Sequence, residues 1–539
     1  MNRNSQIRMT NHEIRRNTEI RITNPIALPS VVRPSSFGFL SSFVIRYSTT
    51  YAKRVHRFHA CEKPNGVCPQ NRAAGFYLDA PVALECNPSM TPKVFNINRR
   101  RFIKTTAAIT AATGMPEWFL ELEQAHAAQP KPLGPNDRPG IALVGCGGQG
   151  RGDCTGAATH GDVLAVCDVD DSHAEAASQQ FTKNGKVPEK YKDFRKLMDR
   201  DDVHAIITGT PDHWHTFVNL LAVKTGKDVY TEKPLTLTID EGKRLVKAVR
   251  ENKRILQVGS QQRSDRNFRL ACELVRNNRL GKLQHIIVGL PTGTVEGPFP
   301  EKPVPEGLNW DYYVGQAPMM PYNGKNCHWD FRWWYAFSGG QMTDWGAHHN
   351  DIAQWGNGTE HSGPVEIDGK SLKEMIPGGY TAAAKYRVDC KYADSVTMSI
   401  VDESTVTDRN VVGEGKKTPN GVQFIGPEGW IFVTRGSIKA SKDELLQDPL
   451  PESAIKLYKS SNHMGNFFES IRSRKDPICP VEIGHRSITV AHLGVISVRM
   501  KQALKWNPDK EEFTGDNAKE ANKWLVREQR NPYNYSFIA

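Results

Sequence analysis

A glycine-rich turn near residue 145 is the first part of the chain whose residue types and spacing could do chemistry. Its residues, Gly145-Cys146-Gly147-Gly148-Gln149-Gly150, match G-x-G-x-x-G. In such a turn the first glycine permits a tight bend, the second lets the backbone approach a pyrophosphate, and the third lets the next helix pack closely on its strand. Asp168 ends the following apolar run, 23 residues after Gly145, where an acid accepts hydrogen bonds from ribose hydroxyls. The pattern predicts a dinucleotide site.

The acidic residues after this run indicate which dinucleotide would bind. Asp168 is followed by Asp170 and Asp171. These carboxylates would repel the 2′-phosphate of NADP, whereas the free ribose hydroxyls of NAD can donate hydrogen bonds to Asp168. We therefore expect NAD as the cofactor, with NADP less favoured.

A second stretch places a base and two acids at helical spacing. At 100° per residue, Asp344, His348, Asp351 and Trp355 fall within about 60° of one another on one helix face, and His349 points elsewhere. Histidine can accept a hydroxyl proton near neutral pH, and a carboxylate can orient its ring. The same stripe could instead be a buried polar network, or it could hold a divalent metal through Asp344, His348 and Asp351. No Cys/His spacing indicates zinc, and we expect no metal.

The elements that would hold these residues alternate between strand and helix. Short apolar runs bounded by turns are typical of buried parallel strands, and the stretches between them of crossover helices. We expect strands at Gly140–Val144, Val163–Cys167, Ala205–Thr208, Asp228–Tyr230 and Ile255–Val258, and helices at Glu189–Met198, Phe217–Lys224 and Asp240–Glu251. This order predicts a doubly wound parallel sheet, an α/β Rossmann domain over residues 136–262.

From about residue 263 the pattern changes to short β-rich runs separated by long loops. We expect strands at Gln284–Leu290, Tyr380–Arg387, Ser395–Val401, Val422–Ile425 and Trp430–Val433, and helices at Met464–Ile471 and Ile483–Met500. Six of the eleven tryptophans lie within residues 310–355. Their flat apolar faces and polar N–H suit sugar rings as well as a packed core. Residues 263–535 are thus predicted to form a second, substrate-binding and catalytic domain.

Four motifs, in order along the chain, resemble those of one enzyme family. They are Thr210-Pro211-Asp212-His213-Trp214-His215, then Thr231-Glu232-Lys233-Pro234, then Gly259-Ser260-Gln261-Gln262-Arg263, and last the segment 339–351 with the spacing Gly-Gly-x-x-x-Asp-x-Gly-x-His-x-x-Asp. Together they resemble the Gfo/Idh/MocA family of sugar and cyclitol oxidoreductases. The sequence departs from the family at Asp212, where Asn is commoner.

The resemblance implies a fold and a set of site residues. The fold is a Rossmann domain followed by an α+β domain with a large open, mostly antiparallel sheet. The family's reactive lysine, aspartate and histidine correspond to Lys233, Asp344 and His348. The cofactor-binding residues are Gly145, Gly147, Gly148, Gln149, Gly150, Asp168, Thr210, Pro211, His215, Glu232 and Lys233. His215 could equally cap or pack a helix, and Arg332, Trp333 and Asp351 are candidate substrate contacts.

These residues suit hydride transfer from a carbinol carbon. His348 would remove the hydroxyl proton, and Lys233 would stabilise the negative charge that develops on the same oxygen. We expect an NAD-dependent oxidoreductase that acts on a CH–OH group of a sugar or cyclitol and holds its cofactor tightly. The alternatives are an NAD-dependent glycoside hydrolase or lyase that oxidises its sugar transiently without net redox change, and a non-catalytic NAD-binding module.

The distribution of charge argues against a nucleic-acid partner. Residues 1–89 carry a net charge of +7 and residues 90–127 one of +2, so residues 128–539 carry only +2 of the total of +11. A nucleic-acid footprint needs lysines and arginines clustered on the folded domain. The positive charge lies instead in the leader.

The leader resembles an export signal. The segment Asn98-Arg99-Arg100-Arg101-Phe102-Ile103-Lys104 resembles a twin-arginine motif, and a weakly apolar stretch and Ala125-His126-Ala127 follow it. We expect residues 90–127 to be a twin-arginine signal peptide, and residues 1–89 to be disordered or an over-extended gene start. The twin-arginine machinery would place the protein in the periplasm or cell envelope. Separately, we expect a homo-oligomer (dimer or tetramer). No apolar run approaches the ~18–20 residues of a membrane helix.

Overall fold

The computed structural model describes residues 137–405, 418–447 and 450–539. The expected signal peptide and the residues before it lie outside the described residues. Within the described ranges, no helix combines the length and the apolar character that crossing a membrane requires.

The first half of the described chain forms a six-stranded parallel sheet. Its strands are β1 (Gly140–Val144), β2 (Asp162–Cys167), β3 (Glu189–Tyr191), β4 (Ala205–Thr208), β5 (Asp228–Thr231) and β6 (Leu256–Val258), in the order β3-β2-β1-β4-β5-β6. Every neighbouring pair is parallel. The order reverses between β1 and β4, so the cleft at their carboxyl ends is where a doubly wound sheet binds its ligand.

Helices cover both faces of this sheet. They are α3 (Gly148–Ala157), α4 (Asp171–Gln180), α5 (Phe194–Met198), α6 (Asp212–Lys224) and α7 (Ile239–Glu251). Because side chains alternate along a strand, Ile141 and Leu143 pack with α3 and α4, whereas Ala142 and Val144 pack with α5, α6 and α7. The predicted Rossmann domain is therefore confirmed as an α/β doubly wound fold.

One predicted helix in this domain is wrong. The segment Glu189–Met198 was expected to be helical, but Glu189–Tyr191 is strand β3, and only Phe194–Met198 is helical. Asp193 separates the two because its side chain accepts a hydrogen bond from the N–H of Arg195 and caps α5. An aspartate side chain disfavours the interior of a helix, because it hydrogen-bonds to nearby backbone groups, and it favours the position just before the first helical residue. The pairing of Lys190 with Val166 fixes the preceding residues in the sheet.

The second half forms a nine-stranded open sheet. Its strands are β7 (His285–Leu290), β8 (Glu366–Ser371), β9 (Tyr386–Lys391), β10 (Thr397–Asp402), β11 (Gly421–Gly426), β12 (Gly429–Thr434), β13 (Ser437–Ala440), β14 (Leu504–Asn507) and β15 (Glu512–Thr514). Their order is β13-β12-β11-β7-β10-β9-β8-β14-β15, and only β7 and β10 pair in parallel. The expected open, mostly antiparallel sheet is confirmed. The expected strand Tyr380–Arg387 lies six residues further along, at β9.

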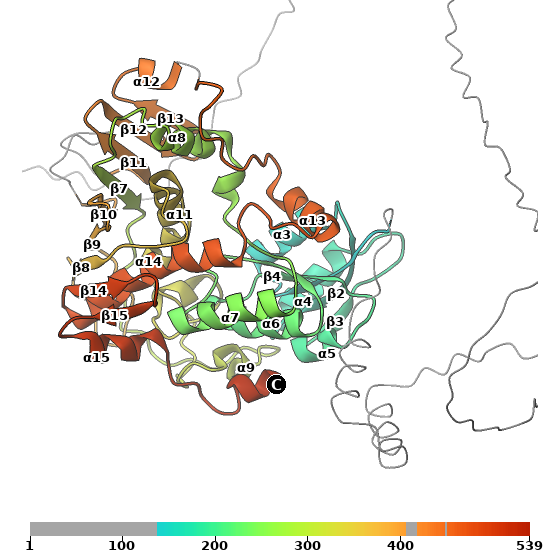
Figure 1. The fold of residues 1–539 in the computed structure, drawn as a ribbon. Coiled ribbons are helices and arrows are strands. Elements are labelled where there is room, and N and C mark those ends of the chain that lie inside the picture. The colour runs from blue at the N-terminus through green and yellow to red at the C-terminus, as the bar shows by residue number, and fades with distance from the viewer. Residues whose placement is uncertain (1–136, 406–417, 448–449) are drawn as a thin grey trace, which may run out of the picture. The chain divides into compact units, whose positions relative to one another are not determined.

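Helices and short turns complete this half. They are η1 (Gln261–Ser264), α8 (Arg266–Arg276), α9 (Trp310–Val314), η2 (His328–Trp333), α10 (Gln341–Asp344), α11 (Gly346–Asn357), α12 (Glu444–Gln447), α13 (His463–Ser473), α14 (Val481–Met500), α15 (Ala518–Ala521), η3 (Asn522–Leu525) and η4 (Tyr535–Ile538). Helix α13 returns to the Rossmann sheet and lies beside α3 (Figure 1), where Phe467 and Phe468 join the same apolar cluster as Ile141.

Helix α14 belongs to the cores of both halves. Its residues Ile483 and Ile488 pack with the Rossmann helices, and Val490 and Leu493 pack with the second sheet. Sixteen of its 20 residues are buried, so the helix is covered along most of its length. Gly484 lets it approach β6, where an added Cβ would lie 2.5 Å from Val258. The two sheets are thus joined through one buried helix.

Candidate active site

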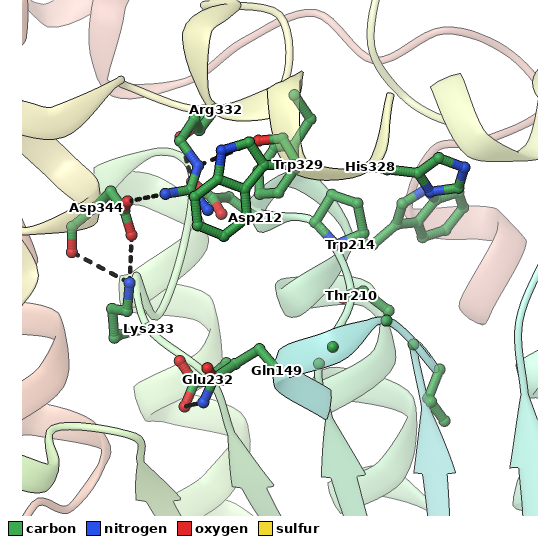
Figure 2. Close-up of a pocket in the computed structure, with 18 of the residues that line it drawn as sticks. Gln149, Thr210, Asp212, Trp214, Glu232, Lys233, His328, Trp329, Arg332 and Asp344 are labelled. Carbon is green, nitrogen blue, oxygen red and sulfur yellow. Dashed lines mark hydrogen bonds and ion pairs between the residues drawn. The ribbon is translucent and has the colours of Figure 1, made fainter. Parts of the chain in front are cut away.

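A cavity of about 1120 Å³ lies at the carboxyl ends of the Rossmann strands and is closed by residues of the second half. One end is lined by the glycine-rich turn and Asp168, and the other by Lys233, Asp344 and His348. Figure 2 shows residues that line this cavity, with Lys233 below Asp344, and Arg332 and Trp329 in the upper part of the view. The structure therefore brings the predicted cofactor and catalytic residues to one hollow.

The glycine-rich turn fits a bound pyrophosphate. Gly145 has a φ of +88°, and a Cβ on Gly150 would lie 2.1 Å from the carbonyl oxygen of Gly145, so both positions require glycine. Added Cβ atoms on Gly147 and Gly148 would meet nothing within 4 Å, because both residues face the cavity. No side chain caps the start of α3 at Gly147. Its first N–H groups are thus free to bind an anion.

Asp168 is held in place by the backbone. Its carboxylate accepts hydrogen bonds from the N–H of Cys146 at 2.6 Å and from the N–H of Asp170 at 2.9 Å. Asp168 lines the cavity, so its carboxylate can accept hydrogen bonds from the two hydroxyls of a ribose bound there. Across the same end, His328 of the second half lies 3.2 Å from an Asp170 oxygen, and its ring is 4.5 Å from that of His173. These contacts join the two halves of the molecule beside Asp168.

The remaining predicted cofactor residues surround the next part of the cavity. Gln149, Thr210, Pro211 and Glu232 line it, and Gln149 donates a hydrogen bond to Glu232 at 3.4 Å (Figure 2). His215 does not line it. Its two ring nitrogens lie 2.6 and 2.8 Å from the carbonyl oxygens of Pro234 and Thr210, and burial lowers its pKa to about 4. His215 ties together the chain segments that follow β4 and β5.

At the other end of the cavity, Asp344 lies between two cations. Lys233 donates to one of its carboxylate oxygens and also to its main-chain carbonyl at 3.3 Å, while Arg332 donates to the other carboxylate oxygen at 2.8 Å. Burial alone would raise the pKa of Asp344, but Lys233 and Arg332 outweigh it and hold this pKa below its usual value. Burial alone would lower the pKa of Lys233, but Asp344 and Glu232 together outweigh it and raise this pKa. The site therefore contains a charged ammonium and a charged carboxylate.

His348 is a neutral base in this environment. It is 5% exposed and lines the cavity beside Trp345, with 5.8 Å between the ring centres. Burial, Lys233 and Arg435 all lower its pKa well below the usual value, so the imidazole is unprotonated and can accept a proton. Asp344 was expected to orient this ring, but among the described residues its carboxylate hydrogen-bonds to the two cations instead. A carboxylate binds a charged donor more strongly than a neutral one.

The predicted substrate contacts are placed differently from one another. Arg332 lines the cavity, and its guanidinium carbon lies 3.8 Å from the ring centre of Trp329. Trp333 is 8% exposed and belongs to an aromatic cluster outside the lining. Asp351 is wholly buried and also outside the lining, and its two oxygens accept hydrogen bonds from Arg263 at 2.7 and 2.9 Å. His349 points away from the cavity, as expected, toward Asn420 at 2.8 Å.

This geometry does not suit a metal at Asp344, His348 and Asp351. Two cations already compensate Asp344, and Asp351 is paired with Arg263. Among the described residues, metal-binding side chains converge at Asp170, His173 and His328, near Asp168. One Asp170 oxygen there already caps α4 through Ser172.

Two cavity residues, Asp212 and Arg435, were missing from the predicted site. Asp212 begins α6 and accepts a hydrogen bond from Ser338 at 2.5 Å. Burial raises its pKa to about 7, and the charge of Asp344 adds to this effect. Its substitution for the commoner Asn was the available signal. Arg435 follows β12 outside any motif, and nothing in the sequence marks it.

Comparison with known proteins agrees with this geometry. Residues 140–260 match the profile described as oxidoreductase family, NAD-binding Rossmann fold, and residues 294–535 match that of the oxidoreductase family C-terminal alpha/beta domain. The two profiles carry the same family name and together cover about two-thirds of the chain. The first domain is thus an NAD-binding Rossmann domain.

Curated relatives are similar over part of the chain. An inositol 2-dehydrogenase/D-chiro-inositol 3-dehydrogenase of Lacticaseibacillus casei is 34% identical over 155 residues, which are 28% of this chain and 42% of that protein. A glycosyl hydrolase family 109 protein of Shewanella pealeana is 28% identical over 207 residues, which are 35% of this chain and 45% of that protein. The chain spans less than half the length of these curated relatives.

Solved structures share the fold over nearly their whole length. The WlbA dehydrogenase from Chromobacterium violaceum, solved with NADH and UDP-GlcNAcA, has a TM-score of 0.51 at 17% identity; the match covers 70% of this chain and 98% of that one. The aldose-aldose oxidoreductase from Caulobacter crescentus has a TM-score of 0.50 at 18% identity, over 68% and 99%. The fold, the cavity and the two profiles agree, and the chain belongs to the Gfo/Idh/MocA oxidoreductase family.

Proposed function

We propose that this protein is an NAD-dependent oxidoreductase that moves a hydride between a CH–OH carbon of a sugar or cyclitol and a tightly held nicotinamide cofactor. The observation that carries the proposal is the continuous cavity, which has a dinucleotide cradle at one end and the Lys233–Asp344–His348 group at the other. The similarity to an inositol dehydrogenase supports this class of substrate.

The side chains at the second end can divide the chemistry between them. NAD supplies the hydride acceptor when it is bound. Neutral His348 accepts the hydroxyl proton as the carbon–hydrogen bond gives up its electron pair and the carbonyl forms. The Lys233 ammonium stabilises negative charge on the same oxygen. Asp344 holds Lys233 and Arg332 in position through its two carboxylate oxygens.

A spectrum of the purified protein tests this proposal. The full chain, isolated without added NAD, is mixed with a panel of sugars and cyclitols while the near-ultraviolet absorbance is recorded. A reduced-nicotinamide band that persists until a carbonyl compound is added supports an oxidoreductase with a resident cofactor. The absence of bound nucleotide, or rapid exchange with added NAD after dialysis, would contradict a tightly held cofactor.

We further propose that the protein is exported by the twin-arginine machinery to the periplasm or cell envelope and acts there as a homo-oligomer. The twin-arginine-like segment 98–104 supports export. The seven cysteines of the described residues are all buried and free, as suits a protein that folds in a reducing cytoplasm. N-terminal sequencing of the native protein tests the cleavage after Ala127, and a mature peptide containing Arg15 and Arg16 would contradict it. Light scattering tests the oligomer.

A second candidate function is glycoside cleavage through transient oxidation of the sugar. The observation in its favour is Asp212, whose pKa of about 7 leaves a carboxylic acid in the same cavity as a neutral base. Such a pair can donate one proton and accept another. Release of a chromogenic aglycone without net NADH would identify this activity. Failure of both reactions in single-turnover experiments would leave a non-catalytic NAD-binding module.

A further inference from the structure

One guanidinium that lines the cavity close to His348 has no carboxylate partner among the residues that the structure describes. Arg435 lies in the turn between β12 and β13, and its guanidinium carbon is 4.7 Å from the ring centre of Trp345. It forms no hydrogen bond or ion pair with any residue in the described ranges. Glu232 and Asp344 attract it only through space. Stacking on an indole holds a guanidinium plane while leaving its N–H groups free to donate.

Arg332 shows what a compensated arginine looks like in the same cavity. It too stacks on a tryptophan, with 3.8 Å between its guanidinium carbon and the ring centre of Trp329. Unlike Arg435, it donates to Asp344 at 2.8 Å. Each arginine thus stacks on a tryptophan, and among the described residues only Arg332 also pairs with a carboxylate.

The charges around the base leave this region positive. Three cations, Lys233, Arg332 and Arg435, lie among the carboxyl groups of Asp344, Glu232 and Asp212, and burial raises the pKa of the last two, to about 7 for Asp212. A cavity with an excess of one charge favours ligands of the opposite charge. A guanidinium presents parallel N–H groups that match the two oxygens of a carboxylate.

The base and the arginine lie beside the same indole ring. The ring centre of Trp345 lies 5.8 Å from the His348 ring and 4.7 Å from the Arg435 guanidinium carbon. Arg435 and His348 therefore both lie against Trp345, and all three residues line the cavity. A substrate whose hydroxyl reaches His348 would extend a substituent of the same ring past Trp345 to Arg435.

We propose that Arg435 binds a carboxylate on the substrate, so that the protein acts on acidic sugars such as uronic or aldonic acids rather than on neutral ones. The inference rests on the proposed oxidoreductase function and narrows its substrate class. Arg435 is a specificity-determining residue in this view, and His348 and Lys233 remain the residues at the reacting carbon.

Binding without turnover tests the anion site separately from the chemistry. The full chain is saturated with NADH, and calorimetry compares glucose with glucuronate and galactose with galacturonate. We expect an acid in at least one pair to bind at least about tenfold more tightly than its neutral partner, since a hydrogen bond to a charged group contributes that much. In Arg435→Gln the preference falls to near unity, and in Arg435→Lys it is intermediate. Lys439→Gln removes one positive charge from the neighbouring strand β13, outside the cavity. This control variant should keep the preference for the acid.

The outcomes separate this inference from the proposed function. Equal binding of acid and neutral sugars in both pairs would overturn the anion site. So would an acid preference that survives in Arg435→Gln, or that Lys439→Gln removes equally. A loss of rate in Arg435→Gln that is the same for acid and neutral sugars, with a shifted pH profile, would show that Arg435 serves only to keep His348 neutral. If the acids bind as expected but no bound sugar reduces NAD, the oxidoreductase proposal fails and the anion site is supported.

Discussion

The two ends of the cavity are built in different ways. At the cofactor end, main-chain groups define the geometry: glycines shape the turn, and the N–H groups of Cys146 and Asp170 donate hydrogen bonds to the Asp168 carboxylate. At the reacting end, Asp344 is held by side-chain charges, one of them on Lys233, 111 residues away in sequence. The first end forms within one domain, whereas the second exists only where two domains meet. Substitutions should therefore affect cofactor retention at one end and chemistry at the other.

The largest effect should come from His348. We expect His348→Asn to lower the single-turnover rate of hydride transfer by between about 10²- and 10⁴-fold, because the proton acceptor is lost. Retention of NAD through purification should be unchanged. His349→Asn is the matched control on the same helix, since that ring faces Asn420 outside the cavity. Equal losses in the two variants would remove His348 from the role of base.

Lys233→Met should lower the same rate by about 10²- to 10³-fold, the range for losing one donor to a developing oxyanion. Asp344 would keep only Arg332, so its pKa should rise and the rate should become more sensitive to acid. A pH–rate profile checks the second point. Lys247→Met, on the exposed surface of α7, is the control. If the variant keeps its rate of hydride transfer but loses bound NAD, Lys233 serves cofactor binding rather than the chemical step.

Asp168→Asn should act on binding alone. An amide accepts a weaker hydrogen bond than a carboxylate, so we expect NAD affinity to fall about tenfold, measured by equilibrium titration of the apo protein. The preference for NAD over NADP should narrow, because a negative charge near the 2′ position is gone. The rate of hydride transfer at saturating NAD should stay within a few-fold of wild type. A large fall in that rate would mean that the two ends are not independent.

The smallest effect should be a pH-dependent gain in stability in Asp212→Asn. The folded pKa of Asp212 is about 7, above the ordinary value of 3.8. Between these values the unfolded carboxyl ionises while the folded one stays protonated, so the wild type loses stability as pH rises through this window. The amide does not titrate and can still accept the Ser338 hydrogen bond. We expect thermal unfolding midpoints that coincide near pH 4 and favour the variant by a few degrees at pH 8; equal midpoints throughout would contradict the raised pKa.

Sequence reasoning succeeded where short-range patterns decide the structure. The strand–turn–helix signal at residues 140–157 and the alternation after it predict the Rossmann domain, because buried strands and glycine turns are local features. It failed at Glu189–Tyr191, where pairing with β2 overrides a helical pattern. It also placed the strand around Tyr386 six residues too early. The start of β9 is decided by its pairing with neighbouring strands, which the sequence of this segment alone does not show.

The contacts at the reacting end were harder to predict from the sequence, because they join residues that are far apart along the chain. The helix-face argument correctly separated His348 from His349, since both lie on one helix. The partners of Asp344 could not be deduced, because Arg332 and Lys233 reach it from distant segments. Asp351 shares the face of His348 in projection, but Arg263 of η1, 88 residues away in sequence, forms an ion pair with its carboxylate. Arg435 depends on a hairpin whose position only the assembled sheet defines.

Helix α14 has a consequence for how a cofactor could leave. A hinge between the two sheets would have to draw Ile483 and Ile488, or Val490 and Leu493, out of one of the two cores that they share, and each exposed side chain would cost about 1.5–3 kcal/mol. The described residues accordingly belong to one compact unit. We therefore expect the two halves to unfold in one transition, and a dinucleotide between them to leave without a hinge motion of the two sheets.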